Sequence, residues 1–233
     1  MIELRDIRSQ ASSFSSLGFE NVTLSVPRGR YAAILSEQND GLSQLFEIVA
    51  LLDHRWSGEY FLDGQAIHML PFADRRELRN SHIGCICPAS LVRELSVAEN
   101  IEISLSYRGV PRSARRRQID EVLESFGMSD LAGSDLADLT DAQRVLTATA
   151  RVAAAPPAVV LASDPTATLG ANDSRTFFET LRRLSSEGAT VILTTTSPRT
   201  ARIADQIFHL DQGRFAGRGS GARRASAGLS AAI

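Results

Sequence analysis

Lysine is absent from this chain, and all 25 of its basic side chains are arginines. A phosphate-binding loop that depends on a lysine ammonium group is therefore excluded at every position. Cysteine is scarce as well, because only Cys85 and Cys87 are present, two residues apart in an apolar run. On a strand both side chains would point to the same face and could not bridge each other, which favours a compartment that keeps thiols reduced.

The sequence also lacks long apolar runs and an excess of charge of one sign. No apolar segment approaches the ~20 residues that span a bilayer, and no signal-peptide pattern opens the chain. The net charge of −2 argues against a dedicated nucleic-acid binder. If the protein works at a membrane, we expect it to dock onto a partner that spans the membrane.

What is present is typical of a soluble α/β protein. The 233 residues, 43% of them hydrophobic and 22% charged, are enough for one sizeable core. Apolar runs between turn residues predict strands over residues 2–8, 22–26, 31–35, 57–65, 82–87, 159–162, 191–194, 207–210 and 214–216. Helical periodicity predicts helices over residues 42–52, 73–80, 97–107, 112–126, 139–154 and 172–186. The continuous apolar runs at 159–162 and 191–194 favour parallel strands that are buried on both faces.

The rest of the chain is organised around residues 32–45, where a buried strand passes through a short polar loop into a helix. This is the layout of a phosphate-binding P-loop, whose pattern is G-x-x-x-x-G-K-[ST]. On that pattern Ser36 takes the place of the first glycine and Gly41 that of the second. Leu42 stands where the lysine belongs, and Ser43 where a hydroxyl would hold magnesium.

The loop thus keeps the layout of a nucleotide site without much of its chemistry. Ser36, Gly41, Ser43 and the following Gln44 are the candidate nucleotide contacts that remain. Two carboxyl-bearing residues at positions 37 and 40 lie where the negatively charged phosphates of ATP would have to bind. An ordinary connection from strand to helix, with no phosphate chemistry, fits the same residues.

Other segments carry a family resemblance. Glu99-Asn100-Ile101 followed by residues 105–110, Leu-Ser-Tyr-Arg-Gly-Val, is similar to the E-N-[IV]…P-L-x-Y-R-G-V stretch of one group of ABC transporter ATPases. The turn Asp63-Gly64 and the closing segment 210–214 also fit. In this order and spacing, residues 2–216 resemble the ATP-binding subunit of an ABC transporter, closest to the lipoprotein-release, macrolide-export and cell-division group.

The resemblance implies a P-loop NTPase-like RecA core with a mostly parallel sheet, an N-terminal antiparallel β subdomain and an inserted helical subdomain. We expect residues 1–216 to form this nucleotide-binding-domain fold, with the helical subdomain at about 89–154. Residues 217–233, mostly Gly, Ala, Ser and Arg, have little to bury and are predicted to form a flexible tail.

The family's functional motifs can be compared with this sequence one at a time. At the signature L-S-G-G-Q, which contacts the γ phosphate across a dimer interface, the chain has Thr140 for the serine and keeps Gln143. Asp141 replaces the first glycine there and would place a carboxylate against the phosphate. At Walker B, Ser163 replaces the magnesium-orienting aspartate, and Asp164 replaces the glutamate that polarises the attacking water. A carboxylate shortened by one methylene matters because a general base must come within about 3 Å of its proton.

Three further positions depart from the family pattern. Pro88 stands where a glutamine would contact magnesium, Thr196 where a histidine would contact the γ phosphate, and Gly170 where the loop after Walker B has an aspartate. Phe14 is the candidate for the aromatic residue that stacks on adenine, and loop packing accounts for it equally well. No metal site is expected, because the four histidines show no ligand spacing.

The sequence supports one hypothesis first: a pseudo-ATPase, kept as a structural or regulatory subunit that hydrolyses no ATP by itself. The resemblance implies a transmembrane permease as partner, a homo- or heterodimer with another ABC ATPase domain, and a cytoplasmic place at the inner face of the plasma membrane. In this hypothesis no cofactor is expected. One alternative is an active subunit that binds ATP and Mg²⁺ and hydrolyses ATP with an intact partner in a lipoprotein, macrolide or peptide exporter. Another is a soluble scaffold or sensor outside transport.

Overall fold

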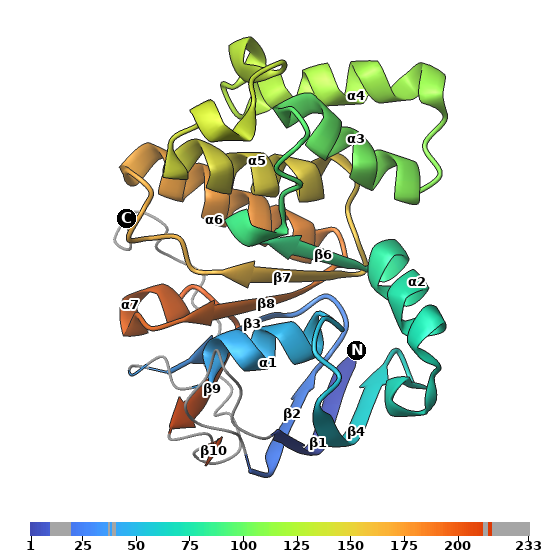
Figure 1. Cartoon of the computed structure of the whole chain (residues 1–233). Coiled ribbons are helices and arrows are strands. Elements are labelled where there is room, and N and C mark those ends of the chain that lie inside the picture. The colour runs from blue at the N-terminus through green and yellow to red at the C-terminus, as the bar shows by residue number, and fades with distance from the viewer. Residues whose placement is uncertain (10–19, 37, 39–40, 212–213, 216–233) are drawn as a thin grey trace.

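The computed structural model describes residues 1–9, 20–36, 38, 41–211 and 214–215. It contains two sheets and the helices that cover them (Figure 1). The expected carboxyl groups at positions 37 and 40, Phe14 and the expected tail at 217–233 lie outside the described residues. No helix in the described ranges is both long and apolar enough to cross a bilayer.

The first sheet is antiparallel, with strand order β2-β1-β4-β5. Its strands are β1 (Ile2–Ser9), β2 (Val22–Val26), β4 (Trp56–Leu62) and β5 (Gln65–Ala66). Opposite Gly58 of β4 the β1 backbone comes so close that a Cβ atom there would lie 2.5 Å from the carbonyl oxygen of Asp6. Only glycine fits at this position, which also has a φ of +106°.

The second sheet has the strand order β10-β9-β3-β8-β7-β6. Its strands are β3 (Tyr31–Leu35), β6 (Ile83–Ile86), β7 (Val159–Ser163), β8 (Thr190–Thr195), β9 (Gln206–Asp211) and β10 (Arg214–Phe215). The strands from β9 to β6 pair in parallel, and only β10 is antiparallel to its neighbour. This architecture confirms the expected α/β class, with an antiparallel N-terminal sheet and a mostly parallel core sheet.

The helices lie on both faces of the parallel sheet. They are α1 (Leu42–Val49), α2 (Phe72–His82), α3 (Val97–Tyr107), α4 (Arg112–Ser125), α5 (Asp141–Ala154), α6 (Ala171–Ser186) and α7 (Pro198–Ala201). In Figure 1, α3, α4 and α5 form a helical layer above β6 and β7, whereas α1 lies in front of the sheet. Short 3₁₀ turns occur at Ile67–Met69, Pro88–Ser90, Ser129–Leu131 and Leu136–Asp138.

The core explains why β3 reads as a continuous apolar run. Its alternate residues Tyr31, Ala33 and Leu35 pack into the cluster formed with α3, α4, α5 and α6. The residues between them, Ala32 and Ile34, pack with α1 and the antiparallel sheet. Because successive side chains of a strand point to opposite faces, burial on both sides leaves no polar alternation.

The first helix is shorter than its periodicity predicts. It ends at Val49 rather than at residue 52, because Leu51 takes a left-handed φ of 57° and the backbone N–H of Leu52 turns back to the carbonyl oxygen of Glu47, 2.8 Å away. This local hydrogen bond satisfies a helix-terminal carbonyl group. The predicted strand at 57–65 likewise divides at the Asp63-Gly64 turn, whose two φ angles are both positive.

Candidate functional site

The carboxyl ends of four parallel strands meet at one edge of the core sheet. The register pairs Leu35 of β3 with Thr195 of β8, and Thr194 of β8 with Ser163 of β7. At the far side Ile86 of β6 pairs with Ala162 of β7. This edge therefore collects the expected site residues Ser36, Pro88, Asp164 and Thr196, at the place where open α/β sheets bind ligands.

The connection from β3 to α1 begins and ends in well-defined conformations. Ser36 is 2% exposed, and its backbone N–H donates to the carbonyl oxygen of Thr195, 3.1 Å away. Gly41 adopts a left-handed φ of 76° just before the first residue of α1. Its carbonyl oxygen accepts the first bond of the helix from the N–H of Leu45 at 2.9 Å. The predicted passage from strand through loop to helix is thus present.

The side chains that follow Gly41 point in different directions. Leu42 is 4% exposed and belongs to the hydrophobic cluster between α1 and the antiparallel sheet. Gln44 is also buried, whereas Ser43 is exposed in the first turn of α1. Position 42 therefore contributes apolar packing rather than a charge to this edge. Of the candidate contacts in α1, only Ser43 offers its side chain to solvent.

The carboxylate of Asp164 is held by local hydrogen bonds. Its Oδ1 accepts from the backbone N–H of Thr166 at 2.8 Å. Its Oδ2 accepts from the hydroxyl group of Thr195, which in turn accepts from the backbone N–H of Ser197 at 2.9 Å. The adjacent Ser163 and Thr196 are exposed and carry no charge. Sequence reasoning missed Thr195, although its hydroxyl group joins the end of β8 to Asp164, the residue after β7.

Pro88 begins a 3₁₀ turn that a partly buried arginine holds in place. Arg151 of α5 donates from Nη1 to the carbonyl oxygen of Ser90 at 2.6 Å, and from Nη2 to the carbonyl oxygen of Cys85 at 3.0 Å. Nη2 also bonds to the Ser90 hydroxyl group. Burial lowers the pKa of the Arg151 guanidinium, and no carboxylate in the described residues forms an ion pair with it.

Arg151 was also missed from the sequence. Its helical spacing could have identified it. Arg151 lies four residues after Thr147 and three after Ala148, and both of these are fully buried, so it is placed on the core face of α5. A second buried side chain fixes the segment after the turn. Asn100 accepts from the backbone N–H of Val92 at 2.8 Å and donates to the carbonyl oxygens of Val92, Leu95 and Ser96.

The expected signature residues lie at the opposite end of α5. Thr140 is the N-cap of this helix, and its hydroxyl accepts from the N–H of Gln143 at 3.2 Å while the Gln143 side chain accepts from the N–H of Thr140 at 2.8 Å. Both polar groups are thus used in a capping box. With a rise of ~1.5 Å per residue, Thr140 lies roughly 16 Å along the axis from Arg151. Thr140 and Gln143 thus lie at the end of α5 away from the Pro88–Ser90 turn that Arg151 contacts.

Asp141 adds a negative charge at this helix start. It is largely exposed, and its carboxylate forms an ion pair with Arg144 at 2.6 Å. No group of three or more His, Cys, Asp or Glu residues in the described ranges is arranged to hold a metal ion. The two cysteines are free and partly buried; burial, with a smaller contribution from Cys87, raises the pKa of Cys85 to about 12.

The two sheets, the helical layer and the motif order define a class of protein, the ATP-binding cassette. The family model for ABC transporters matches residues 19–167, and the chain belongs to this family as an ATP-binding domain. This confirms the family expected from the sequence.

Particular relatives lie close to the chain in sequence. It is 31% identical over 210 residues to the macrolide export ATP-binding/permease protein MacB 1/2 of Paracoccus denitrificans, covering 89% of this chain and 31% of that protein. It is 27% identical over 228 residues to the uncharacterized ABC transporter ATP-binding protein YknY of Bacillus subtilis, covering 96% of this chain and 98% of YknY. The chain thus spans about a third of the macrolide-export relative and nearly all of YknY.

A solved structure agrees closely with the fold. The ATP-binding cassette MJ0796, in a dimeric post-hydrolysis state bound to ADP and Pi, has a TM-score of 0.86 and 25% sequence identity. The match covers 96% of this chain and all of that one. The two chains therefore share one fold over nearly their whole matched length.

Proposed function

We propose that this chain is a pseudo-ATPase: an ABC cassette retained as a structural or regulatory subunit of a membrane transporter complex, without ATP hydrolysis of its own. Its partners would be a transmembrane permease and a second ABC ATPase domain, and it would lie at the cytoplasmic face of the plasma membrane. The names of its relatives support these two partners, because MacB joins an ATP-binding part and a permease part, and MJ0796 is dimeric.

The observation that carries the proposal is the chemistry at the carboxyl edge of the core sheet. A bound triphosphate needs positive charge, and magnesium needs oxygen ligands, above all a carboxylate. Position 42 there is a leucine packed in the core, and positions 88, 163 and 196 hold proline, serine and threonine. None of these side chains carries a charge. These residues do not fit Mg-ATP as the family uses it.

The carboxylate of Asp164, at the Walker B position, is also hydrogen-bonded within the chain. Both carboxylate oxygens of Asp164 accept hydrogen bonds, from Thr166 and Thr195, which fix the orientation of the shortened side chain and weaken it as a base. Removing one positioned catalytic group costs about 10²- to 10⁴-fold in rate, although such losses do not add within one catalytic unit. Phosphoryl transfer depends almost wholly on positioning and charge neutralisation, and both are missing here.

The signature end of α5 supports the same conclusion for a composite site with a partner. Thr140 and Gln143 satisfy each other in the capping box, and the carboxylate of Asp141 stands beside them. A phosphate brought to this helix start by a second cassette would meet the Asp141 carboxylate, which the ion pair with Arg144 balances only in part and which opposes the favourable helix dipole.

The segment that follows Pro88 is the proposed contact with the permease. Leu91 is buried in the core, but Val92 is 39% exposed and its backbone is held by Asn100. A rigid, partly apolar segment suits a docking surface, because little conformational entropy is lost when a partner binds it.

Isothermal titration with Mg-ATP, together with a phosphate-release assay, tests the proposal. We expect no binding in the low micromolar range and no turnover by the purified chain. Co-expression with the permease encoded beside it, if one is present, should yield a complex, and capture through an affinity tag would detect it. ATP turnover by that complex which disappears in the Thr140→Ala variant would replace the proposal by the active-subunit alternative.

A further inference from the structure

Helix α2 (Phe72–His82) is unusual among the helices because none of its residues is buried. An isolated helix of this length is marginal in water, and helices in proteins gain most of their stability from a packed face. Its residues Phe72, Arg75, Arg76 and Arg79 are spaced i, i+3, i+4 and i+7 and therefore share one face. That face borders a hollow with the segment between α1 and β4.

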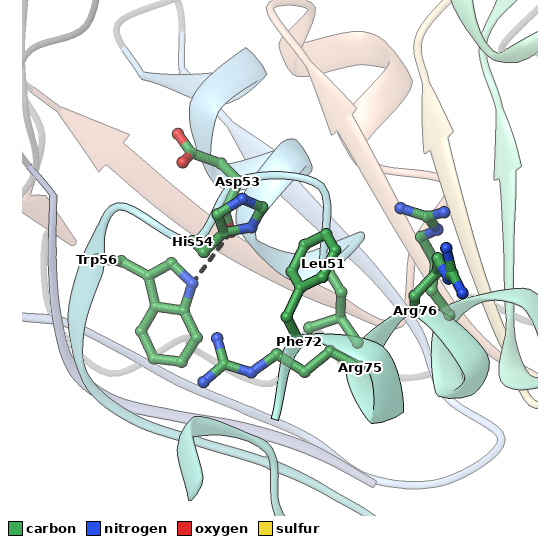
Figure 2. Close-up of a pocket in the computed structure, with 8 residues that line it drawn as sticks. Leu51, Asp53, His54, Trp56, Phe72, Arg75 and Arg76 are labelled. Atoms are coloured by element: carbon green, nitrogen blue, oxygen red, sulfur yellow. Dashed lines mark hydrogen bonds between the residues drawn. The ribbon is translucent and has the colours of Figure 1, made fainter. Parts of the chain in front are cut away.

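Figure 2 shows this hollow, in which Phe72 stands beside Leu51 and His54. The rings of Phe72 and His54 meet edge to face with centroids 5.2 Å apart. Arg75 reaches toward Trp56, over whose ring its guanidinium lies at 5.7 Å, and donates to the carbonyl oxygens of Leu70 and His68. Arg75 is thus part of the wall of the hollow.

The other two arginines have no acidic partner. No carboxylate in the described part of the chain lies within ion-pair distance of Arg76 or Arg79. Among the described residues, the only acid that lines the hollow is Asp53, which is 7% exposed and already paired with Arg55 at 3.0 Å. The acidic residues of α2 itself are Asp74 and Glu77, which by helical spacing lie on the side opposite Phe72 and Arg79. The hollow therefore carries a net positive charge.

Apolar surface lies next to this charge. Phe72, which lines the hollow, is 63% exposed. Leu52, next to the lining residue Leu51, is 46% exposed, and Met69, three positions before Phe72, is 75% exposed. Guanidinium groups match carboxylates with paired hydrogen bonds. The hollow itself has a volume of ≈ 10 Å³, room for about one water-sized group, so a larger ligand would bind on the exposed face of α2 rather than inside the hollow.

From these observations we infer that the α2 face formed by Phe72, Arg76 and Arg79 is a docking site for an acidic segment of a partner protein. A carboxylate of that segment would bind Arg76 and Arg79, and a neighbouring aliphatic or aromatic side chain would pack on Phe72. This site lies on α2, apart from the carboxyl edge of the core sheet, and it does not depend on whether the chain hydrolyses ATP.

Fluorescence anisotropy with labelled short peptides tests the site. Each peptide carries glutamates around a single phenylalanine or leucine, and its matched control has glutamines in place of the glutamates. We expect the acidic peptides to bind and the glutamine peptides not to bind. The double variant Arg76→Gln/Arg79→Gln should weaken binding about a hundredfold, because two charge-assisted hydrogen bonds are lost, each worth about tenfold.

Arg116→Gln/Arg117→Gln is the matched control, because it removes the same charge from exposed arginines of α4 that are paired with Asp120 and Glu121. This variant should bind the acidic peptides as the parent protein does, whereas Phe72→Ser should bind them more weakly. Equal losses in both double variants, or equal binding of acidic and glutamine peptides, would overturn the proposal. Binding to phosphatidylglycerol vesicles without binding to the peptides would also overturn it, in favour of a membrane surface.

Discussion

The hydrogen bonds by which Arg151 holds the Pro88–Ser90 turn, here called the Arg151 clamp, lead to a quantitative prediction. Replacing Arg151 with methionine keeps much of the aliphatic volume and removes three hydrogen bonds, two to Ser90 and one to the carbonyl oxygen of Cys85. Hydrogen bonds from a charged donor contribute about 1.5–3 kcal/mol each. The buried charge itself costs several kcal/mol of desolvation, which offsets part of that sum.

The carbonyl groups of Cys85 and Ser90 are not affected equally by the loss of this hydrogen-bond donor. The Ser90 hydroxyl lies 3.2 Å from the carbonyl oxygen of Cys85, but its single hydrogen is shared with the carbonyl oxygen of Cys87 at 2.7 Å, so it replaces the lost donor in part. The carbonyl oxygen of Ser90 loses the guanidinium that pairs with it. We therefore expect Arg151→Met to lower the free energy of unfolding by about 2–3 kcal/mol. At about 2–4 °C per kcal/mol for a chain of this size, the Tm should fall by roughly 4–12 °C.

Thermal unfolding followed by circular dichroism measures the change, and Arg116→Met is the control. Arg116 is an exposed residue with one i,i+4 ion pair, so its loss should cost no more than about 0.5 kcal/mol. Hydrogen exchange should also accelerate at the backbone N–H groups of Ser90 and Leu91, which close the turn. If Arg151→Met is no more destabilising than Arg116→Met, the turn is not held by this guanidinium and the reasoning fails.

Three further predictions follow from the site. Thr140→Ala should lower stability by about 1 kcal/mol through loss of the α5 cap, seen as a Tm lower by about 2–4 °C; no change would mean that the cap is not formed. Asp164→Glu should lower the Tm, because the longer side chain breaks its bonds to Thr166 and Thr195, and a phosphate-release assay should detect no turnover; a gain of ATPase activity would contradict the account. In Cys87→Ser, burial should keep the pKa of Cys85 well above its usual value and slow its alkylation by iodoacetamide at pH 8 by at least about a hundredfold relative to a free thiol. The rate should rise as the pH rises, and rapid reaction in the folded protein at pH 8 would refute the burial of this thiol.

The sequence predicted the fold well where one physical signal dominated. β3 and β7 are buried on both faces, and their continuous apolar runs identified them because no polar alternation interrupts such strands. The Asp63-Gly64 turn was predictable because both residues tolerate positive φ. The end of α1 was not predictable, because it depends on the left-handed conformation of Leu51. Leucine rarely adopts this conformation, so the sequence gives no sign of it.

The candidate site was predicted in its positions but not in its connections. Because parallel strands end at one edge, Ser36, Pro88, Asp164 and Thr196 could be expected together. The bond from Thr195 to Asp164 depends on the register of β8 beside β7, and the Arg151 clamp joins residues 61 and 66 positions apart. Such contacts follow from packing between distant segments, which local patterns do not encode.

Thermal unfolding of the purified chain with and without millimolar Mg-ATP tests the pseudo-ATPase assignment most directly. A ligand present at a hundred times its dissociation constant stabilises the folded state by ~2.7 kcal/mol, which is about 5–11 °C in Tm for a chain of this size. The account predicts no shift, because the residues at the carboxyl edge of the core sheet supply neither the positive charge nor the magnesium ligands. A shift of several degrees that requires both ATP and magnesium would contradict it.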